Sequence, residues 1–197
     1  MPRTSDAKTR FIDTAARLFR RRGYDGVGLA EIIAEADAPK GSFYHHFPDG
    51  KEELAEHALR RSAGRFLKTI DQVFGNAPTF PDGVKILFDM IADWFEGSDW
   101  RDGCPITSIV LDTTPASARI LAATQEALES WSRALGDHAK RFGVEGDIEG
   151  LSLRMLMALE GAWILARVTR SREPFRQAAE MVTAICEDEE RPLRQAK

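Results

Sequence analysis

The chain has 197 residues, with 27 lysines and arginines against 31 aspartates and glutamates, so its formal net charge is −4. This length suits one domain, or a small domain joined to a larger one, and can bury a core without cross-links. Two cysteines exclude a disulfide-rich scaffold and indicate a reducing compartment. We find no apolar run of transmembrane length and no secretory leader, so we expect a cytoplasmic protein that is not bound to a membrane. The acidic charge argues at first sight against nucleic-acid binding.

The first 50 residues read as three short helices. Apolar residues recur there at spacings of three and four, which is the periodicity of amphipathic helices. Gly23, Pro39 and Pro48 supply the breaks between or after them. The predicted helices span residues 6–22, 29–36 and 40–47. Because the second and third are short and joined by a tight turn, they predict a helix-turn-helix.

The rest of the chain is also helical in its periodicity. A long helix is predicted over residues 51–74, followed by a loop over 76–83 that contains two prolines and a glycine. The remaining predicted helices span residues 84–95, 106–113, 116–142, 148–169 and 175–187. No segment alternates as a strand does. We therefore predict an all-α protein with a three-helix N-terminal domain over residues 1–50 and a larger helical domain over residues 51–197.

The third predicted helix carries the side chains that a DNA-reading helix needs. In a helix-turn-helix the second helix enters the major groove and presents its N-terminal side chains to the bases. The donors and acceptors available here are those of Lys40, Ser42, Tyr44, His45 and His46. A solvated surface strip or a metal site are the alternatives. Adjacent histidines on a helix point about 100° apart, which is poor geometry for one metal, so we predict no metal and no cofactor.

Several stretches of this domain stand in a characteristic order, of which PKGSFYHHF at residues 39–47 is the most specific. The others are residues 10–19, 23–26, 32–36 and 51–54. Together they resemble the DNA-binding domain of TetR-family repressors. The longer turn at residues 48–51 and the segment Gly103-Cys104-Pro105-Ile106 resemble the YxaF/LmrA-like subgroup.

The resemblance implies a role for each residue of the candidate DNA site. It implies base-edge contacts from Lys40, Ser42 and His45, and phosphate contacts from Tyr44, His46 and Lys51. Lys8 and Arg10 are further candidates for phosphate contacts. Gly28 stands where the family usually has threonine or serine, so one side-chain phosphate contact would be missing.

The charges divide unevenly along the chain. Residues 1–47 carry eight basic and six acidic side chains, a net charge of +2, which leaves −6 on the remainder. DNA affinity depends on local phosphate contacts rather than on the charge of the whole chain. The acidic total is therefore compatible with double-stranded operator DNA bound by the N-terminal domain alone.

A single recognition helix covers only a short half-site, so we expect a homodimer. The resemblance implies a four-helix bundle made by the last two long helices of each copy. The predicted interface residues are Leu128, Trp131, Leu135, Leu156, Leu159 and Trp163. The alternative is that these side chains serve the core of one chain.

The larger domain is rich in aromatic and methionine side chains, which adapt well around an apolar ligand. We predict that Trp94, Trp100, Cys104 and Trp163 contact an apolar or aromatic small molecule whose binding releases the operator. The alternative is a redox-responsive regulator that senses through Cys104, just before a predicted helix start. An enzyme is disfavoured because no phosphate-binding loop, dinucleotide motif, zinc-protease motif or nucleophile elbow is present. A helical interaction module would not need a groove-reading third helix.

Overall fold

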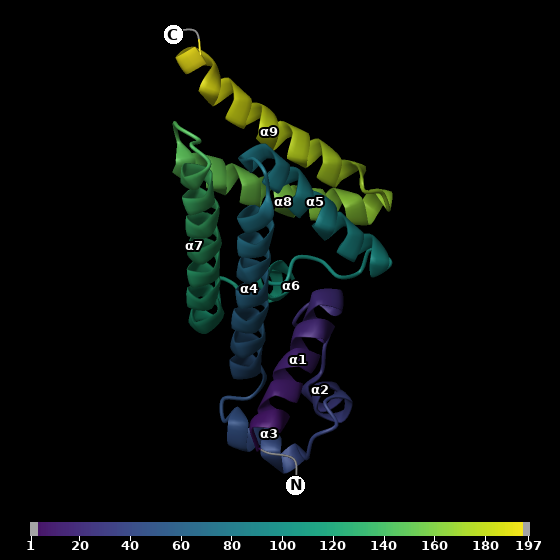
Figure 1. Ribbon diagram of the computed structural model, residues 1–197. Coiled ribbons are helices and arrows are strands. Elements are labelled where there is room, and N and C mark those ends of the chain that lie inside the picture. The colour runs from purple at the N-terminus through teal and green to yellow at the C-terminus, as the bar shows by residue number, and fades with distance from the viewer. Residues whose placement is uncertain (1–3, 195–197) are drawn as a thin grey trace. The chain divides into compact units, whose positions relative to one another are not determined.

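The computed structural model describes residues 4–194, and this part of the chain contains nine helices and no strand (Figure 1). The helices are α1 (Thr4–Arg22), α2 (Leu29–Glu35), α3 (Lys40–His46), α4 (Lys51–Asn76), α5 (Phe80–Gly97), α6 (Thr107–Thr113), α7 (Ala118–Arg141), α8 (Ile148–Thr169) and α9 (Glu173–Arg194). The all-α prediction is therefore confirmed. None of the helices described is long and apolar enough to cross a membrane.

The chain packs as two compact units, each of which is built from two separate stretches of sequence. The first contains residues 1–66 and 102–127, and the second contains residues 67–101 and 128–197. The long helices α4 and α7 contribute one part to each unit. The first unit thus combines the helix-turn-helix with α6 and the start of α7.

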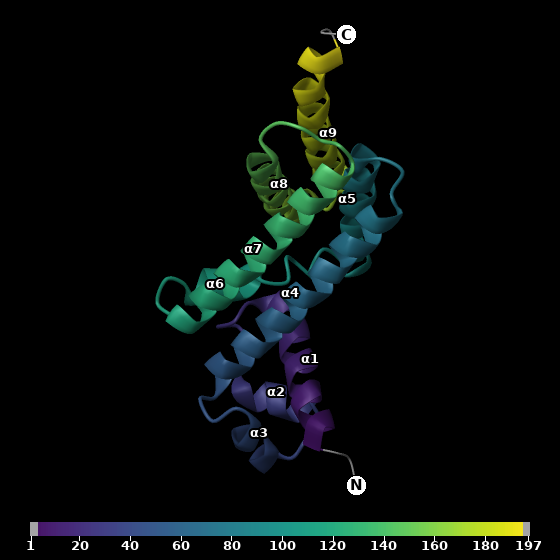
Figure 2. The same cartoon turned by 60° about the vertical axis from the view of Figure 1, so that its left-hand side comes forward.

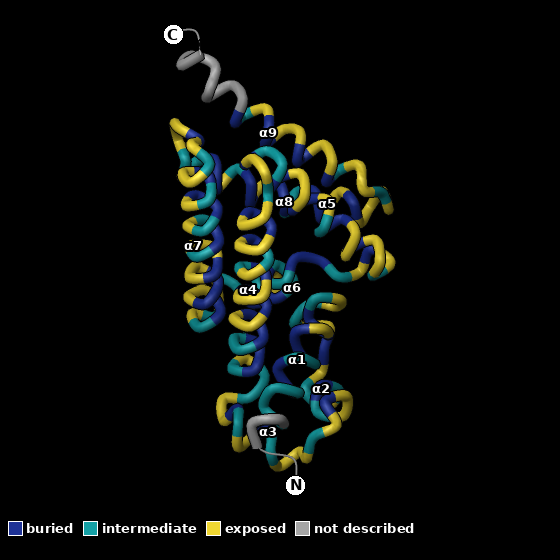
Figure 3. Tube along the Cα trace, viewed as in Figure 1, coloured by how far each residue is buried: buried dark blue, intermediate teal, exposed yellow. Residues whose placement is uncertain are grey.

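Phenylalanines of α1 and α3 build the core of the first unit. Phe11 and Phe19 lie on one face of α1, and both are fully buried. Buried stretches alternate with accessible ones along α1 (Figure 3). The ring of Phe11 meets those of Phe43 and Phe47 edge to face, with centroids 5.4 and 6.2 Å apart. A helix as short as α3 is marginal by itself, so this burial is what holds it in place.

The first helix of the second unit begins earlier than the sequence predicts. Residues 76–83 are expected to form a loop, yet α5 begins at Phe80. Thr79 is its N-cap, and its Oγ1 accepts a hydrogen bond from the backbone N–H of Asp82 at 3.2 Å. Pro81 fits because a proline in the first turn of a helix costs no backbone hydrogen bond. The proline that suggested a loop is therefore part of the helix start.

Helices α5, α8 and α9 form the core of the second unit. In both views α9 lies along α8 and α5 (Figures 1 and 2). The buried side chains between these helices include Phe88, Phe95, Met155 and Phe175. α8 ends at Thr169, and Arg170 adopts the left-handed conformation, with φ of 49°, that turns the chain back into α9.

Candidate nucleic-acid interface

The recognition helix α3 is anchored through two side chains and leaves most of the others accessible. Phe43 and the C-cap residue Phe47 are fully buried. Their rings also contact each other, with centroids 5.3 Å apart. Lys40, Tyr44 and His45 are exposed, and the remaining predicted contacts, Ser42 and His46, are partly exposed. The surface of α3 thus presents the five predicted contacts that lie on this helix. Their individual base and phosphate roles remain predictions.

Three ion pairs fix α2 against α1. Arg10, Arg17 and Arg22 of α1 pair with Asp37, Glu35 and Glu31, at nitrogen–oxygen distances of 3.4, 2.5 and 2.5 Å respectively. The carboxylates that lie on or just after α2 are therefore partly neutralised by α1. This reduces the repulsion that they would exert on a nearby phosphate. It also places Arg10, a candidate phosphate contact, in an ion pair.

Lys51 is the first residue of α4 and does not extend freely into solvent. Its Nζ lies 3.9 Å from the centroid of the Tyr24 ring. Partial burial lowers the pKa of Lys51, although the negative charges of Asp25 and Asp112 oppose that shift. Sequence reasoning predicts a phosphate contact for Lys51 but gives no sign of these neighbours. They come together only through the tertiary packing of the first unit.

The predicted ligand residues are divided between the two units. Cys104 belongs to the first unit and is buried, whereas the three tryptophans belong to the second. Trp94 is 48% exposed, and both Trp100 and Trp163 are buried. The structure therefore does not gather all four side chains within one unit. The two cysteines of the chain form no disulfide, and both are buried.

A chain of aromatic rings surrounds the two buried tryptophans. Phe95 meets Trp100 and Phe175 edge to face, with centroids 5.5 and 6.2 Å apart, and Phe175 meets Trp163 at 5.9 Å. The indole Nε1 of Trp163 is buried without a hydrogen-bond partner among the described residues. Asp99 and Trp100 are consecutive left-handed residues, with φ of 56° and 60°. Backbone strain of this kind is frequent at ligand sites.

Most of the predicted dimer residues lie in the interior of the chain. The buried ones are Trp131, Leu135, Leu156, Leu159 and Trp163. Leu128 is 38% exposed. A side chain that is already buried in one chain has little surface left to bury against a second. These five residues are therefore buried within one chain, and their place in a dimer interface stays a prediction.

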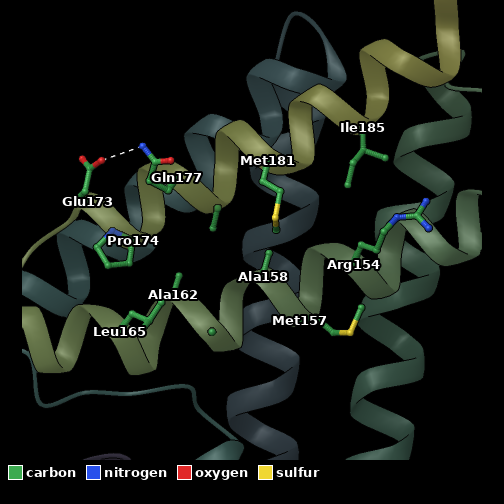
Figure 4. A pocket seen from close by; sticks show the side chains of 12 residues that line it. Arg154, Met157, Ala158, Ala162, Leu165, Glu173, Pro174, Gln177, Met181 and Ile185 are labelled. Carbon is green, nitrogen blue, oxygen red and sulfur yellow. Dashed lines mark hydrogen bonds between the residues drawn. The ribbon is translucent and has the colours of Figure 1, made fainter.

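The exposed apolar surface lies on the other side of α8 and on α9. The exposed large apolar side chains of α8 are Leu153, Met157, Ile164, Leu165 and Val168. Met181 of α9 is also exposed, and it points toward Ala158 of α8 in a groove of about 760 Å³ that Met157 and Leu165 also line (Figure 4). Sequence reasoning missed this surface. The signal was present, because α8 carries apolar residues on opposite sides of the helix, which is the pattern of a helix covered by more than one neighbour.

No metal centre is formed by the described residues, since none of their His, Cys, Asp and Glu side chains gather in groups of three or more that could hold an ion. His45 and His46 lie beside each other, with ring centroids 5.2 Å apart and planes inclined by 61°. They therefore belong to the α3 surface.

Known proteins match the chain over both units. Residues 11–58 match the sequence model of bacterial regulatory proteins of the tetR family, and residues 82–181 match that of the LmrA/YxaF-like transcriptional regulator C-terminal domain. The regulator YxaF of Bacillus subtilis is 26% identical over 94% of this chain and 97% of its own length. The regulator LmrA of the same organism is 27% identical over 86% of this chain and 91% of its own length.

The fold agrees with these sequence matches. The crystal structure of reduced NemR from Escherichia coli covers 90% of this chain and 95% of its own, with a TM-score of 0.80 and 22% identity. The relatives named here are transcriptional regulators and not enzymes. Since the two matching sequence models together take in the helix-turn-helix and most of the remaining helices, the chain belongs to the TetR family of bacterial transcriptional regulators and carries an LmrA/YxaF-like C-terminal domain.

Proposed function

We propose that this regulator is a repressor that binds its operator as a homodimer through α3 and releases it when a small molecule binds the second unit. The observation that carries the DNA contact is the anchoring of α3 by Phe43 and Phe47, which leaves Lys40, Tyr44 and His45 exposed. Repression is favoured by NemR, a sequence relative that is named a transcriptional repressor. Such a protein acts where the chromosome is, in the cytoplasm.

The experiment that tests operator binding uses the intergenic DNA upstream of the protein's own gene. Fluorescence anisotropy at fixed salt should show tight binding by the wild-type chain and a loss of about a hundredfold or more for Tyr44→Ala. Tyr44 is 52% exposed, so its removal leaves the core intact. Ile86→Ala, at an exposed apolar residue of α5, is the matched control and should bind like wild type. If Tyr44→Ala binds the DNA as tightly as Ile86→Ala and wild type do, the proposed role of α3 is refuted.

The proposed effector is an apolar or aromatic small molecule that contacts the rings around Trp100 and Trp163. Two observations support this site. The aromatic rings pack edge to face, and the buried Trp163 Nε1 is a hydrogen-bond donor that an acceptor on the ligand would satisfy. A compound screen should yield molecules that weaken operator binding. By linkage, operator DNA should weaken the binding of such a molecule by the same factor. A broad screen in which no compound changes operator affinity would contradict this proposal.

The redox alternative has less support from the structure. Cys104 is buried, whereas redox-sensing thiols are accessible to the oxidant. We therefore expect hydrogen peroxide to leave operator affinity unchanged. A peroxide effect that disappears in Cys104→Ser would favour the redox mechanism instead.

The proposed pairing surface is the groove between α8 and α9 together with the exposed apolar side chains of α8. Its centre is formed by Met157, Leu165 and Met181, which are all more than half exposed. Arg154 and Glu173 line the same groove and supply charges of both signs. A two-fold related copy presents the same residues in return, so the opposite charges of the two copies can face each other. Burial of such an apolar patch is the ordinary driving force of dimerisation.

A further inference from the structure

Three elements of the first unit meet at the first residue of α4. Lys51 opens that helix, and its Nζ sits over the face of Tyr24, which lies in the connection between α1 and α2. A distance of 3.9 Å is well inside the range at which a cation is attracted by an aromatic ring. The ammonium of Lys51 is partly withdrawn from water, and the carboxylates of Asp25 and Asp112 act on it. Burial outweighs this attraction, so the pKa of Lys51 still lies below its usual value.

Asp112 reaches this place from α6, which lies next to the C-terminal end of α1 (Figure 1). Its Oδ2 accepts the backbone N–H of Asp25 at 3.0 Å, and the N–H of Tyr24 donates to the carbonyl of Ser108 at 3.2 Å. Gly23 is left-handed, with φ of 74°, and a Cβ there would lie 2.5 Å from the Asp112 carboxylate. The glycine thus leaves room for the carboxylate, which is fixed beside the loop that carries Tyr24.

We propose that Asp112 is a positioning residue that competes with an operator phosphate for Lys51. A phosphate that approaches Lys51 meets the negative charge of Asp112, and it must draw the ammonium away from the Tyr24 ring and the two carboxylates. α6 therefore limits the affinity of the first unit for DNA through one lysine. The inference rests on the proposed DNA-binding role of Lys51 and adds the residue that restrains it.

A double-mutant cycle tests this competition. Asp112→Asn removes the charge and keeps an oxygen that can accept the Asp25 N–H. We expect it to tighten binding to the upstream DNA about three- to tenfold and to steepen the salt dependence. In a Lys51→Gln background the gain should be clearly smaller, because only the direct repulsion between Asp112 and the phosphate is left to remove. A merely structural Asp112 would change affinity equally in both backgrounds.

The control is Asp102→Asn, which changes the net charge of the chain by the same amount. Asp102 also belongs to the first unit, but its carboxylate accepts a hydrogen bond from Arg21 at 2.7 Å, and the charges that shift the pKa of Lys51 are those of Asp25 and Asp112. We expect Asp102→Asn to change affinity less than about twofold. If Asp112→Asn fails to fold, Asp25→Asn tests the same competition, because it removes the other carboxylate and leaves the backbone N–H in place.

The outcomes separate the two proposals. If the wild-type chain does not bind the upstream DNA, the proposed function fails and this inference fails with it. If wild type binds but Asp112→Asn weakens binding, only the inference is overturned. The same holds if Asp112→Asn tightens binding as much in the Lys51→Gln background as in wild type.

Discussion

Asp13 of α1 is the residue on which two arginines of α4 converge. Arg61 donates to its two carboxylate oxygens at 2.6 and 2.9 Å, and Arg65 donates to one of them at 2.5 Å. Partial burial raises the pKa of Asp13, but the hydrogen bonds and charges of the two arginines outweigh it, so the pKa lies below its usual value. All three side chains are more than a third exposed, so water and salt weaken the attraction.

Asp13→Asn should therefore destabilise the first unit by about 1 kcal/mol near neutral pH. Because the folded-state pKa is lowered, the stabilisation is present above the ordinary pKa of an aspartate and is lost as the pH falls through the lowered value. Urea denaturation of wild type and variant should show a difference that is constant from about pH 7 to about pH 5 and shrinks below about pH 4. Asp137→Asn, at an exposed carboxylate of α7, is the control and should cost little at any pH. A pH-independent difference would contradict the ion-pair explanation.

Gly28 is the N-cap of α2 and supplies no side-chain acceptor there. Its φ of −80° and ψ of 144° suit any residue, and a Cβ would meet no atom within 4 Å. Gly28→Ser should therefore fold normally, stabilise the helix by only a few tenths of a kcal/mol, and offer a hydroxyl to a phosphate.

We expect Gly28→Ser to tighten operator binding by roughly three- to tenfold, which corresponds to the net contribution of one typical hydrogen bond. Since a hydroxyl releases no counterion, the slope of affinity against salt should not change. The control is Gly64→Ser, at an exposed glycine of α4 where a Cβ also meets nothing. Anisotropy over a salt series separates the outcomes, and a tighter complex with a steeper slope would mean that the gain is electrostatic.

At the scale of elements, α4 and α5 approach each other closely within the second unit. A Cβ at Gly83 would lie 2.5 Å from the ring of Phe74, and that ring is fully buried and stacked 5.5 Å from the ring of His138. The ring cannot swing away without disturbing the core. The absence of a side chain at Gly83 is thus a condition for this pair of helices to pack.

Gly83→Ala should destabilise the protein by about 1–3 kcal/mol, because the new methyl group overpacks the contact. Gly97→Ala, at the other end of the same helix, meets nothing within 4 Å. It should be neutral or slightly stabilising, since alanine has the higher helix propensity. Thermal unfolding of the two variants checks the pair. Equal shifts in Tm would show that the helix propensity of the glycines, and not the contact with Phe74, sets the result.

The helices themselves could be predicted from the sequence because each keeps its apolar residues at helical spacing. The start of α5 could not be predicted, since threonine and proline, here Thr79 and Pro81, are common both in turns and at helix starts. The exposure of the remaining α3 side chains could be predicted, because a short helix that buries Phe43 and Phe47 in the core leaves its other residues at the surface. The meeting of Lys51 with Tyr24 was not, because it depends on tertiary packing and carries no local pattern.

At the scale of the whole molecule, the side chains that pair two copies are harder to predict than those that fold one. α8 carries apolar residues on every face, so periodicity gives no means of choosing between its inner and outer sides. The structure makes the choice, because it buries Trp163 and Leu159 and exposes Met157 and Val168. We propose that a second copy of the chain covers these exposed side chains.

Met157→Glu places a charge in the groove between α8 and α9, so we expect it to convert the dimer into a monomer at micromolar concentration. A monomer carries one recognition helix and can read one half-site, so the advantage of the full operator over a single half-site should disappear. Val168→Glu, at a residue that is 79% exposed, should act in the same direction, and neither variant should lose its helical circular dichroism. Ile86→Glu is the control, because it adds the same charge at an exposed apolar residue of α5 and should remain dimeric. Sedimentation measures the mass of each variant, and fluorescence anisotropy compares its affinity for the full operator with that for a single half-site. A Met157→Glu chain that still sediments as a dimer would place the interface elsewhere.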